Sequence, residues 1–130
     1  METSNEQKRA RKAWELVNSV SDQVIEKYSS LSKSAPVMIL TNGLGQTLAF
    51  FISKSNGKNE YSLLYRHLDL WLSENVVWSA DNTGRKELIE RVINENTQGY
   101  RMATEEALAF HSWIKRFAGA KVPEDDGGKK

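Results

Sequence analysis

The chain has 130 residues, a formal net charge of +1, 39% hydrophobic residues and 27% charged residues. This is the composition of an ordinary soluble globular protein, and the length is sufficient for one domain with a real core. The chain contains no cysteine, which excludes disulfide scaffolds, cysteine-ligated zinc sites and thiol nucleophiles. Because the net charge is small, any binding of a polyanion has to depend on how the charges are arranged.

The N-terminal region predicts a long amphipathic helix. Apolar side chains recur every three or four residues from about residue 5 to residue 31, and Trp14 falls on the apolar side, so we expect it in the core. Glu15 can pair with part of a basic cluster on this helix, so the cluster is either a solvated face or a surface for anions; it consists of Lys8, Arg9, Arg11 and Lys12. The charged start of the chain lacks the apolar stretch of a secretory signal, so we expect a cytoplasmic protein.

Residues 36–54 form the most apolar segment, which predicts a buried helix that begins at its proline. The polar centre of the segment excludes a membrane span. Gly43 and Gly45 each cost roughly 1 kcal/mol relative to alanine inside a helix, so they indicate close approach by another group. That group is either a packed helix or a sugar-phosphate backbone, to which Asn42 and Gln46 would donate hydrogen bonds.

The second half of the chain predicts three more helices, over residues 61–72, 88–93 and 99–120. Residues 81–84 offer several N-caps for the middle one. No segment alternates polar and apolar residues for long enough to be a strand, and residues 121–130 carry no core residue, so we expect a disordered tail. The sequence therefore predicts an all-α fold, a compact single-domain helical bundle of about five main helices over residues 1–120.

No pattern in the sequence indicates a catalytic, metal or cofactor site. His67 and His111 lie on separate predicted helices, and neither has a carboxylate three or four residues later that would complete a metal pair. We expect both to be partly exposed structural residues. The Gly-Leu-Gly run at 43–45 resembles the start of a dinucleotide-binding motif, but Leu48 occupies the third glycine position and no strand precedes it. We therefore expect no cofactor, no metal and no catalytic residue.

Cations on the later helices are candidates for phosphate contacts. Lys115 and Arg116 follow each other in the last helix, whereas Glu105 can neutralise Arg101 earlier in the same helix. Lys54 ends the second helix, where a cation complements the helix dipole and can also reach a phosphate.

Two weaker signals lie beside these cations. Arg85 and Lys86 fall in the expected first turn of the fourth helix, where cations oppose the helix dipole and therefore hint at an external anion. Trp113 neighbours Lys115 and Arg116, so we expect it to be half-exposed, whereas Trp71 lies on an apolar face and is expected in the core.

Three separated motifs, spread in one order over about residues 8–120, resemble the small subunit of the type III-B CRISPR effector, the Cmr complex. The central motif consists of Pro36, Ile39, Gly43-Leu44, Gln46, Leu48-Ala49-Phe50 and Lys54. The flanking matches are Ala13-Trp14-Glu15, Val17, Tyr100, Thr104, Glu106-Ala107-Leu108, Trp113 and Lys115-Arg116-Phe117-Ala118.

This resemblance implies a compact helical protein with no activity of its own. Members of the family lie in several copies along an RNA-guided ribonucleoprotein, opposite the backbone subunits that carry the guide RNA. They help to hold target RNA, and cleavage is the task of a neighbouring subunit. The implied partners are the guide RNA-containing subunits, target single-stranded RNA and further copies of the same protein, with no membrane. Base pairing supplies the sequence specificity in such a complex, so the protein has only to grip the RNA backbone.

We predict a basic groove for target RNA, formed by Lys8, Arg9, Lys12, Lys54, Arg101, Lys115 and Arg116. Lys54, Lys115 and Arg116 belong to the motifs of the resemblance, whereas the N-terminal cluster is inferred from the arrangement of charge. The alternative is a protein scaffold, in which the same cations pair with acidic patches on neighbouring subunits and only those subunits touch RNA.

Overall fold

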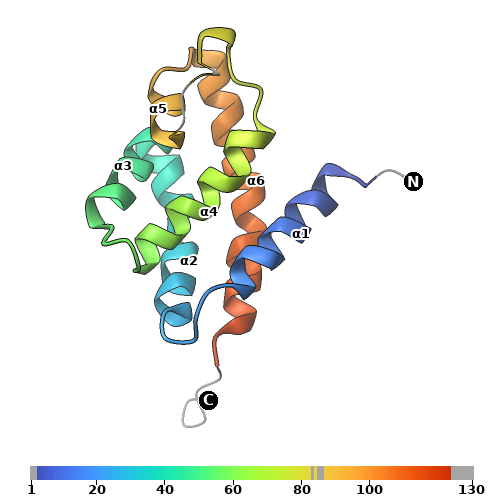
Figure 1. The fold of residues 1–130 in the computed structure, drawn as a ribbon, viewed down its shortest axis with the longest axis vertical. Coiled ribbons are helices and arrows are strands. Elements are labelled where there is room, and N and C mark those ends of the chain that lie inside the picture. Colours follow the sequence, from blue (N-terminus) through green and yellow to red (C-terminus); the bar gives the residue numbers. More distant parts are fainter. Residues whose placement is uncertain (1–2, 83, 85–86, 124–130) are drawn as a thin grey trace.

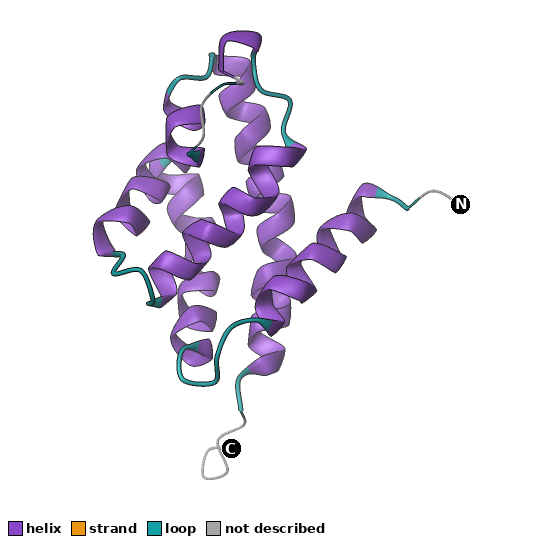
Figure 2. Cartoon of the chain, viewed as in Figure 1, coloured by secondary structure: helices purple, strands orange, loops and turns teal. Residues whose placement is uncertain are grey.

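The structure is a computed structural model that describes residues 3–82, 84 and 87–123. These residues form six α-helices, five of them eleven residues or longer, and no strand (Figures 1 and 2). The helices are α1 (Asn5–Asn18), α2 (Ile25–Asn42), α3 (Leu44–Lys54), α4 (Glu60–Asn75), α5 (Leu88–Ile93) and α6 (Thr97–Lys121), with a 3-10 turn at Ala80–Asn82. The predicted all-α, single-domain bundle of about five main helices is confirmed.

Helix α6 is the longest element, and its 25 residues span about 37 Å. Helices α1, α2, α4 and α5 all pack against it, and α3 packs on α2, α4 and α5. Helix α1 packs almost entirely on α6, and its N-terminal end projects away from the rest of the molecule (Figure 1). The outer surface of the α1–α6 pair is therefore formed by elements from the two ends of the chain.

Side-chain caps explain where three of these helices begin. Ser4 and Gln7 form a reciprocal capping box at the start of α1. Asn59 accepts a hydrogen bond from the backbone N–H of Ser62 at the start of α4, and Asn96 accepts one from that of Gly99 at the start of α6. Each cap satisfies a backbone donor that has no partner within the helix.

The predicted single helix over residues 5–31 is wrong, because α1 ends at Asn18 and α2 begins at Ile25. Ser19 caps the end of α1 with its backbone N–H, and its hydroxyl donates to the carbonyl of Leu16. Val20, in the intervening loop, is buried in the same core as Ile25. The apolar spacing therefore continues across a break in the backbone.

Helix α2 also extends through Pro36, which the sequence placed at a helix start. Proline lacks the N–H that would bond to the carbonyl four residues earlier, here that of Ser32. The Nε2 atom of His111 on α6 lies 2.7 Å from this carbonyl oxygen, and both residues have no exposed surface. The histidine thus supplies the hydrogen bond that the proline removes, which permits proline inside a buried helix.

The apolar segment after Pro36 is two helices rather than one. Gly43 has φ +92° and ψ 158°, a conformation that side chains with a Cβ rarely adopt, and the chain changes direction there. The hydroxyl of Tyr100 lies 3.1 Å from the position of a Cβ on Gly43 and 3.3 Å from one on Gly45. It also accepts a hydrogen bond of 2.8 Å from the N–H of Gly45, and so caps α3, which has no side-chain cap of its own. Of the two interpretations of the glycines, packing against a helix accounts for them.

The remaining helices agree with the predicted ranges within a few residues. Helix α5 has Glu87 at its N-cap position rather than a residue within 81–84, and the 3-10 turn covers Ala80–Asn82. Arg85 and Lys86, the predicted anion signal, lie outside the described residues, as do residues 124–130 of the predicted tail.

Replacing Gly43 with alanine is expected to destabilise the fold by about 1–3 kcal/mol, because it forces a strained φ and crowds the hydroxyl of Tyr100. Gly57→Ala is the matched control, since Gly57 has φ +91° but nothing within 4 Å of an added Cβ. Urea unfolding of both variants separates the two effects. Equal losses of unfolding free energy in the two variants would show that crowding of the Tyr100 hydroxyl adds nothing to the cost of the strained φ.

Candidate nucleic-acid interface

The carboxylate of Glu106 on α6 joins three helices. It accepts two hydrogen bonds from Arg9 on α1, at 2.6 Å from Nε and 2.8 Å from Nη2, and one of 2.8 Å from the indole N–H of Trp71 on α4. The ring of Trp71 stacks on Phe110 with centroids 5.0 Å apart. A bidentate guanidinium–carboxylate pair has a defined orientation, so this contact sets how α1 lies on α6.

The charge of Arg9 is engaged by carboxylates of the protein itself, so Arg9 does not fit the predicted RNA groove. Burial opposes the charged form of Glu106, but hydrogen bonds from Arg9 and Trp71 outweigh it and lower the pKa of the carboxyl. The hydrogen bond to Glu106 raises the pKa of Arg9, which also contacts Glu6 at 3.3 Å. Only 18% of the Arg9 side chain is exposed. We therefore assign Arg9 to the orientation of α1 rather than to a phosphate contact.

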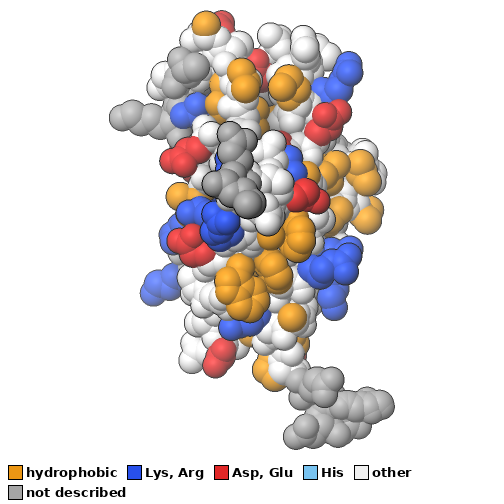
Figure 3. All heavy atoms as spheres, turned by 90° about the vertical axis from the view of Figure 1, so that its right-hand side faces the viewer, with side chains coloured by type: hydrophobic (Ala, Val, Ile, Leu, Met, Phe, Trp, Pro, Cys, Tyr) orange, Lys and Arg blue, Asp and Glu red, His pale blue; other side chains and the backbone are white. Residues whose placement is uncertain are grey.

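Trp14, Trp113 and Phe117 form an aromatic patch on the outer surface of the α1–α6 pair. Trp14 meets Phe117 edge to face with centroids 5.1 Å apart, and Trp113 lies 5.7 Å from the same ring. Trp14 is 49% exposed, so its predicted place in the core is wrong, whereas Trp113 is partly buried as expected. Figure 3 shows hydrophobic side chains gathered on the side from which α1 projects, with basic side chains flanking them.

Two exposed arginines flank the aromatic patch. Arg11 precedes Trp14 by three residues and Arg116 follows Trp113 by three, a spacing that makes side chains neighbours on a helix surface. Trp113 and Arg116 also line a hollow of about 380 Å³ together with Glu6 and Ser112. The sequence placed Arg11 in the basic cluster but not in the predicted groove, and its spacing from Trp14 is the signal that could have included it.

The other predicted cations near this surface lie to either side of the aromatic patch. Lys12 approaches Glu15 at 3.8 Å, and its charge also acts on His67 of α4, so it lies on the α4 side of α1. Lys8, one helical turn earlier, shares that side and is exposed. Lys115 is exposed on α6, but consecutive helical residues diverge by about 100°, which directs it away from its neighbour Arg116.

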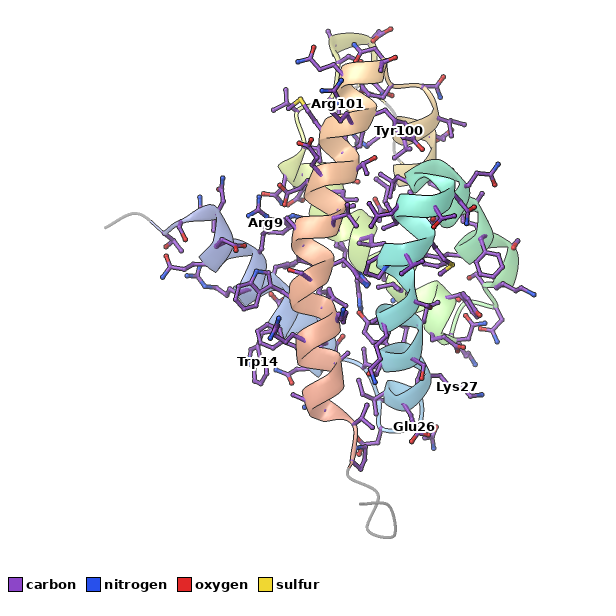
Figure 4. The ribbon with its side chains drawn as sticks, turned by 180° about the vertical axis from the view of Figure 1, so that it is seen from behind. Arg9, Trp14, Glu26, Lys27, Tyr100 and Arg101 are labelled. Carbon is purple, nitrogen blue, oxygen red and sulfur yellow. The ribbon has the colours of Figure 1, made fainter. Side chains whose placement is uncertain are left out.

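Lys54 and Arg101 lie elsewhere on the molecule. Lys54 ends α3, where its ammonium group sits 5.8 Å from the centroid of the Phe50 ring. Arg101 is exposed near the start of α6, about 21 Å along the helix from Lys115. Figure 4 shows Arg101 and Trp14 towards opposite ends of α6. The seven predicted residues therefore do not share one groove.

The break at Gly43 has a hollow of its own, of about 420 Å³, lined by Met38, Asn42, Gln46, Thr47 and Phe50. The two amides that the sequence singled out therefore lie beside apolar side chains. They are remote from α1, which contacts neither α2 nor α3 extensively.

Both histidines are buried, so the expectation that they are partly exposed is wrong. His67 Nδ1 lies 2.7 Å from the hydroxyl of Tyr28, and His111 bonds to the carbonyl of Ser32 as described above. Burial, with a smaller effect of the charges on Arg66 and Lys12, lowers the pKa of His67 to about 4. Burial also lowers the pKa of His111 to about 4, against the hydrogen bond to Ser32 and with a small effect of Lys115.

Within the described residues there is no group of three or more histidine, aspartate or glutamate side chains that could hold a metal ion. No described helix is both long enough and apolar enough to cross a membrane. The fold and its surface thus define a small all-α protein whose notable feature is an exposed basic and aromatic face.

Comparison with known proteins identifies the family. Residues 5–121 match the model of the CRISPR-associated protein family Cas_Cmr5. The crystal structure of a CRISPR-associated Cmr5 family protein from Thermus thermophilus superposes with a TM-score of 0.72 and 27% sequence identity, covering 93% of this chain and 100% of that one. The chain belongs to the Cas_Cmr5 family and is a small structural subunit of the type III-B Cmr complex, which confirms the resemblance in its sequence.

The buried histidines predict a loss of stability in mild acid. Between pH 6.5 and about 4, His67 and His111 bind protons in the unfolded chain but remain neutral in the folded one. The free energy of unfolding therefore falls as the pH is lowered through this range. The loss is up to about 3 kcal/mol for each histidine. Urea unfolding at several pH values measures it.

Two substitutions serve as the control for this effect. His67→Asn and His111→Gln place an amide near the bonding nitrogen without a group that titrates, and together they should flatten the dependence between pH 6.5 and 4. A dependence that begins only below about pH 4.5 in the unmodified protein would assign it to carboxylates instead.

Proposed function

We propose that this protein is a non-catalytic subunit that holds target RNA against the guide RNA through its α1–α6 face. The observation that carries the proposal is the pair of exposed arginines, Arg11 and Arg116, beside an exposed aromatic patch. Membership of the Cas_Cmr5 family supports an RNA-guided complex as the setting, and hence the cytoplasm as the location.

A few cations per protomer are sufficient for this role. Phosphate contacts position a nucleic acid without reading its sequence, and base pairing with the guide supplies the specificity. Copies of the subunit repeated along the complex multiply a weak contact into a strong one. A net charge of only +1 is therefore compatible with RNA binding, provided that the cations lie on one face.

We place Arg116 and Arg11 at the centre of the RNA contact, with Lys8, Lys12 and Lys115 at its edges. Lys54 ends α3, which lies on the opposite side of the molecule from α1 (Figure 1), and Arg101 lies towards the other end of α6 from Trp14 (Figure 4), so neither touches the same few nucleotides. Each of them is available for a contact with RNA or with a subunit at another place in the assembly.

The second candidate function is a scaffold that binds only neighbouring subunits or copies of itself. The observation in its favour is a pair of exposed apolar side chains on α2, where Val37 is 64% exposed and Leu40 is 72% exposed. Neither side chain belongs to the hydrophobic core. Apolar side chains three residues apart on a helix surface are suited to packing against a partner.

Replacing Arg116 with glutamine is expected to weaken target RNA binding by the assembled complex and to reduce the slope of log K against log salt by about one, because one phosphate contact is lost. Filter binding over a series of salt concentrations measures both quantities. Lys115→Gln is the matched control, since it removes the same charge from the next residue but on another side of α6, and it should have a smaller effect. Unchanged affinity and slope in the Arg116 variant would favour the scaffold.

A further inference from the structure

Trp14 contributes little to the packing of the bundle. Its ring touches Phe117 edge to face, and about half of its surface remains in contact with solvent. The buried tryptophans, in contrast, each have a role in the bundle, since Trp71 stacks on Phe110 and Trp78 bonds to the carbonyl of Ser73. Large aromatic side chains that gather on a surface indicate a binding site.

The environment of the aromatic patch is polar and cationic rather than apolar. Trp113 donates its indole N–H to Glu6 at 3.1 Å, which fixes the ring at the rim of the hollow it shares with Arg116. Tryptophan and arginine are enriched in protein interfaces as well, but glutamate, which lines this hollow as Glu6, is depleted there. Aromatic rings interleaved with cations are instead the arrangement that binds single-stranded nucleic acid, in which bases stack on the rings and phosphates meet the cations.

We propose that the aromatic patch stacks against unpaired bases of single-stranded RNA, while Arg11 and Arg116 hold the phosphates on either side. The exposed ring of Trp14 is the main stacking surface, and Phe117 supports it from beneath through the edge-to-face contact. The proposal rests on the proposed function in one respect, that RNA lies on the α1–α6 face, and it concerns nucleotides of that RNA that are not paired with the guide. It adds a contact to the bases where the proposed function requires contacts to the backbone alone.

Two properties of binding follow from stacking. Every base has a flat face, so the contact tolerates any sequence. Bases inside a duplex have no free face, so the chain should bind single-stranded RNA in preference to a duplex of the same sequence. Backbone contacts alone predict no such preference for unpaired bases.

The experiment compares two substitutions of similar size in the isolated full-length chain. Trp14→Phe keeps an aromatic face, whereas Trp14→Met keeps an apolar side chain against Phe117 and removes the ring. Binding of a labelled single-stranded RNA of about twelve nucleotides is followed by fluorescence anisotropy at several low salt concentrations. Thermal unfolding of each variant establishes that it is folded, and Leu40→Ala serves as a control at an exposed apolar residue on another helix.

We expect the Met variant to bind roughly tenfold more weakly with an unchanged salt slope, the Phe variant to keep most of the affinity, and the Leu40 variant to bind normally. Arg116→Gln should reduce the salt slope in the same assay. We also expect single-stranded RNA to quench the tryptophan fluorescence of the unmodified chain, because two of its four tryptophans lie at this surface.

Other outcomes overturn the proposal in distinguishable ways. Normal binding by the Met variant together with weaker binding by the Arg116 variant would remove stacking and leave the backbone contact of the proposed function. Normal RNA binding by the Met variant with loss of assembly into the complex would make the aromatic patch a protein interface. No binding by the unmodified chain at low salt would overturn both proposals.

Discussion

The bundle depends on a hydrogen bond that crosses from α6 to α2. Pro36 removes one bond from the interior of α2, and His111 replaces it from a neighbouring helix at 2.7 Å. An unpaired carbonyl in this fully buried position would cost about 1–3 kcal/mol, so α2 and α6 are stable together only where these groups face each other. The carbonyl can only accept, so the neutral ring favoured by the lowered pKa of His111 has to be the tautomer that carries its hydrogen on Nε2. Since most other helices pack on α6, the register of this pair positions the rest of the fold.

Helical periodicity was sufficient to predict the all-α class and the ranges of α4 and α6, because each buries one continuous side in the core. It failed where the core continues across a break in the backbone, as between Val20 and Ile25. At Gly43 the energetic cost of glycine indicated close approach, but the positive φ and the approach of Tyr100 depend on a residue more than fifty positions away. Pro36 was likewise assigned to a helix start, because the hydrogen bond from His111 that permits it inside α2 comes from a distant part of the chain.

The candidate site shows a similar division between local and distant information. Composition and spacing located the cations, but they could not tell which cation is neutralised. Arg9 and Arg11 are two residues apart on one helix, yet the first is engaged by Glu106, 97 positions later, and the second is exposed to meet a ligand. Trp14 and Trp71 both fell on apolar sides, and only the packing of α1 on a single helix shows why one of them remains exposed. The charge pattern thus indicated the kind of surface, whereas only the fold shows which residues belong to it.

The attachment of α1 has a thermodynamic consequence for anything that binds beside it. This helix packs almost entirely on α6 and is joined to α2 by the loop of residues 19–24, so the α1–α6 face spans a junction between a helix that packs on four others and a helix that packs mainly on α6. A ligand that contacts both helices stabilises their association by RT ln(1 + [L]/Kd). By the same linkage, a change that loosens the packing of α1 on α6 weakens the binding of that ligand. The order of α1 and the fraction of protomers with ligand bound on the α1–α6 face are therefore linked. Binding of such a ligand makes α1 more rigid.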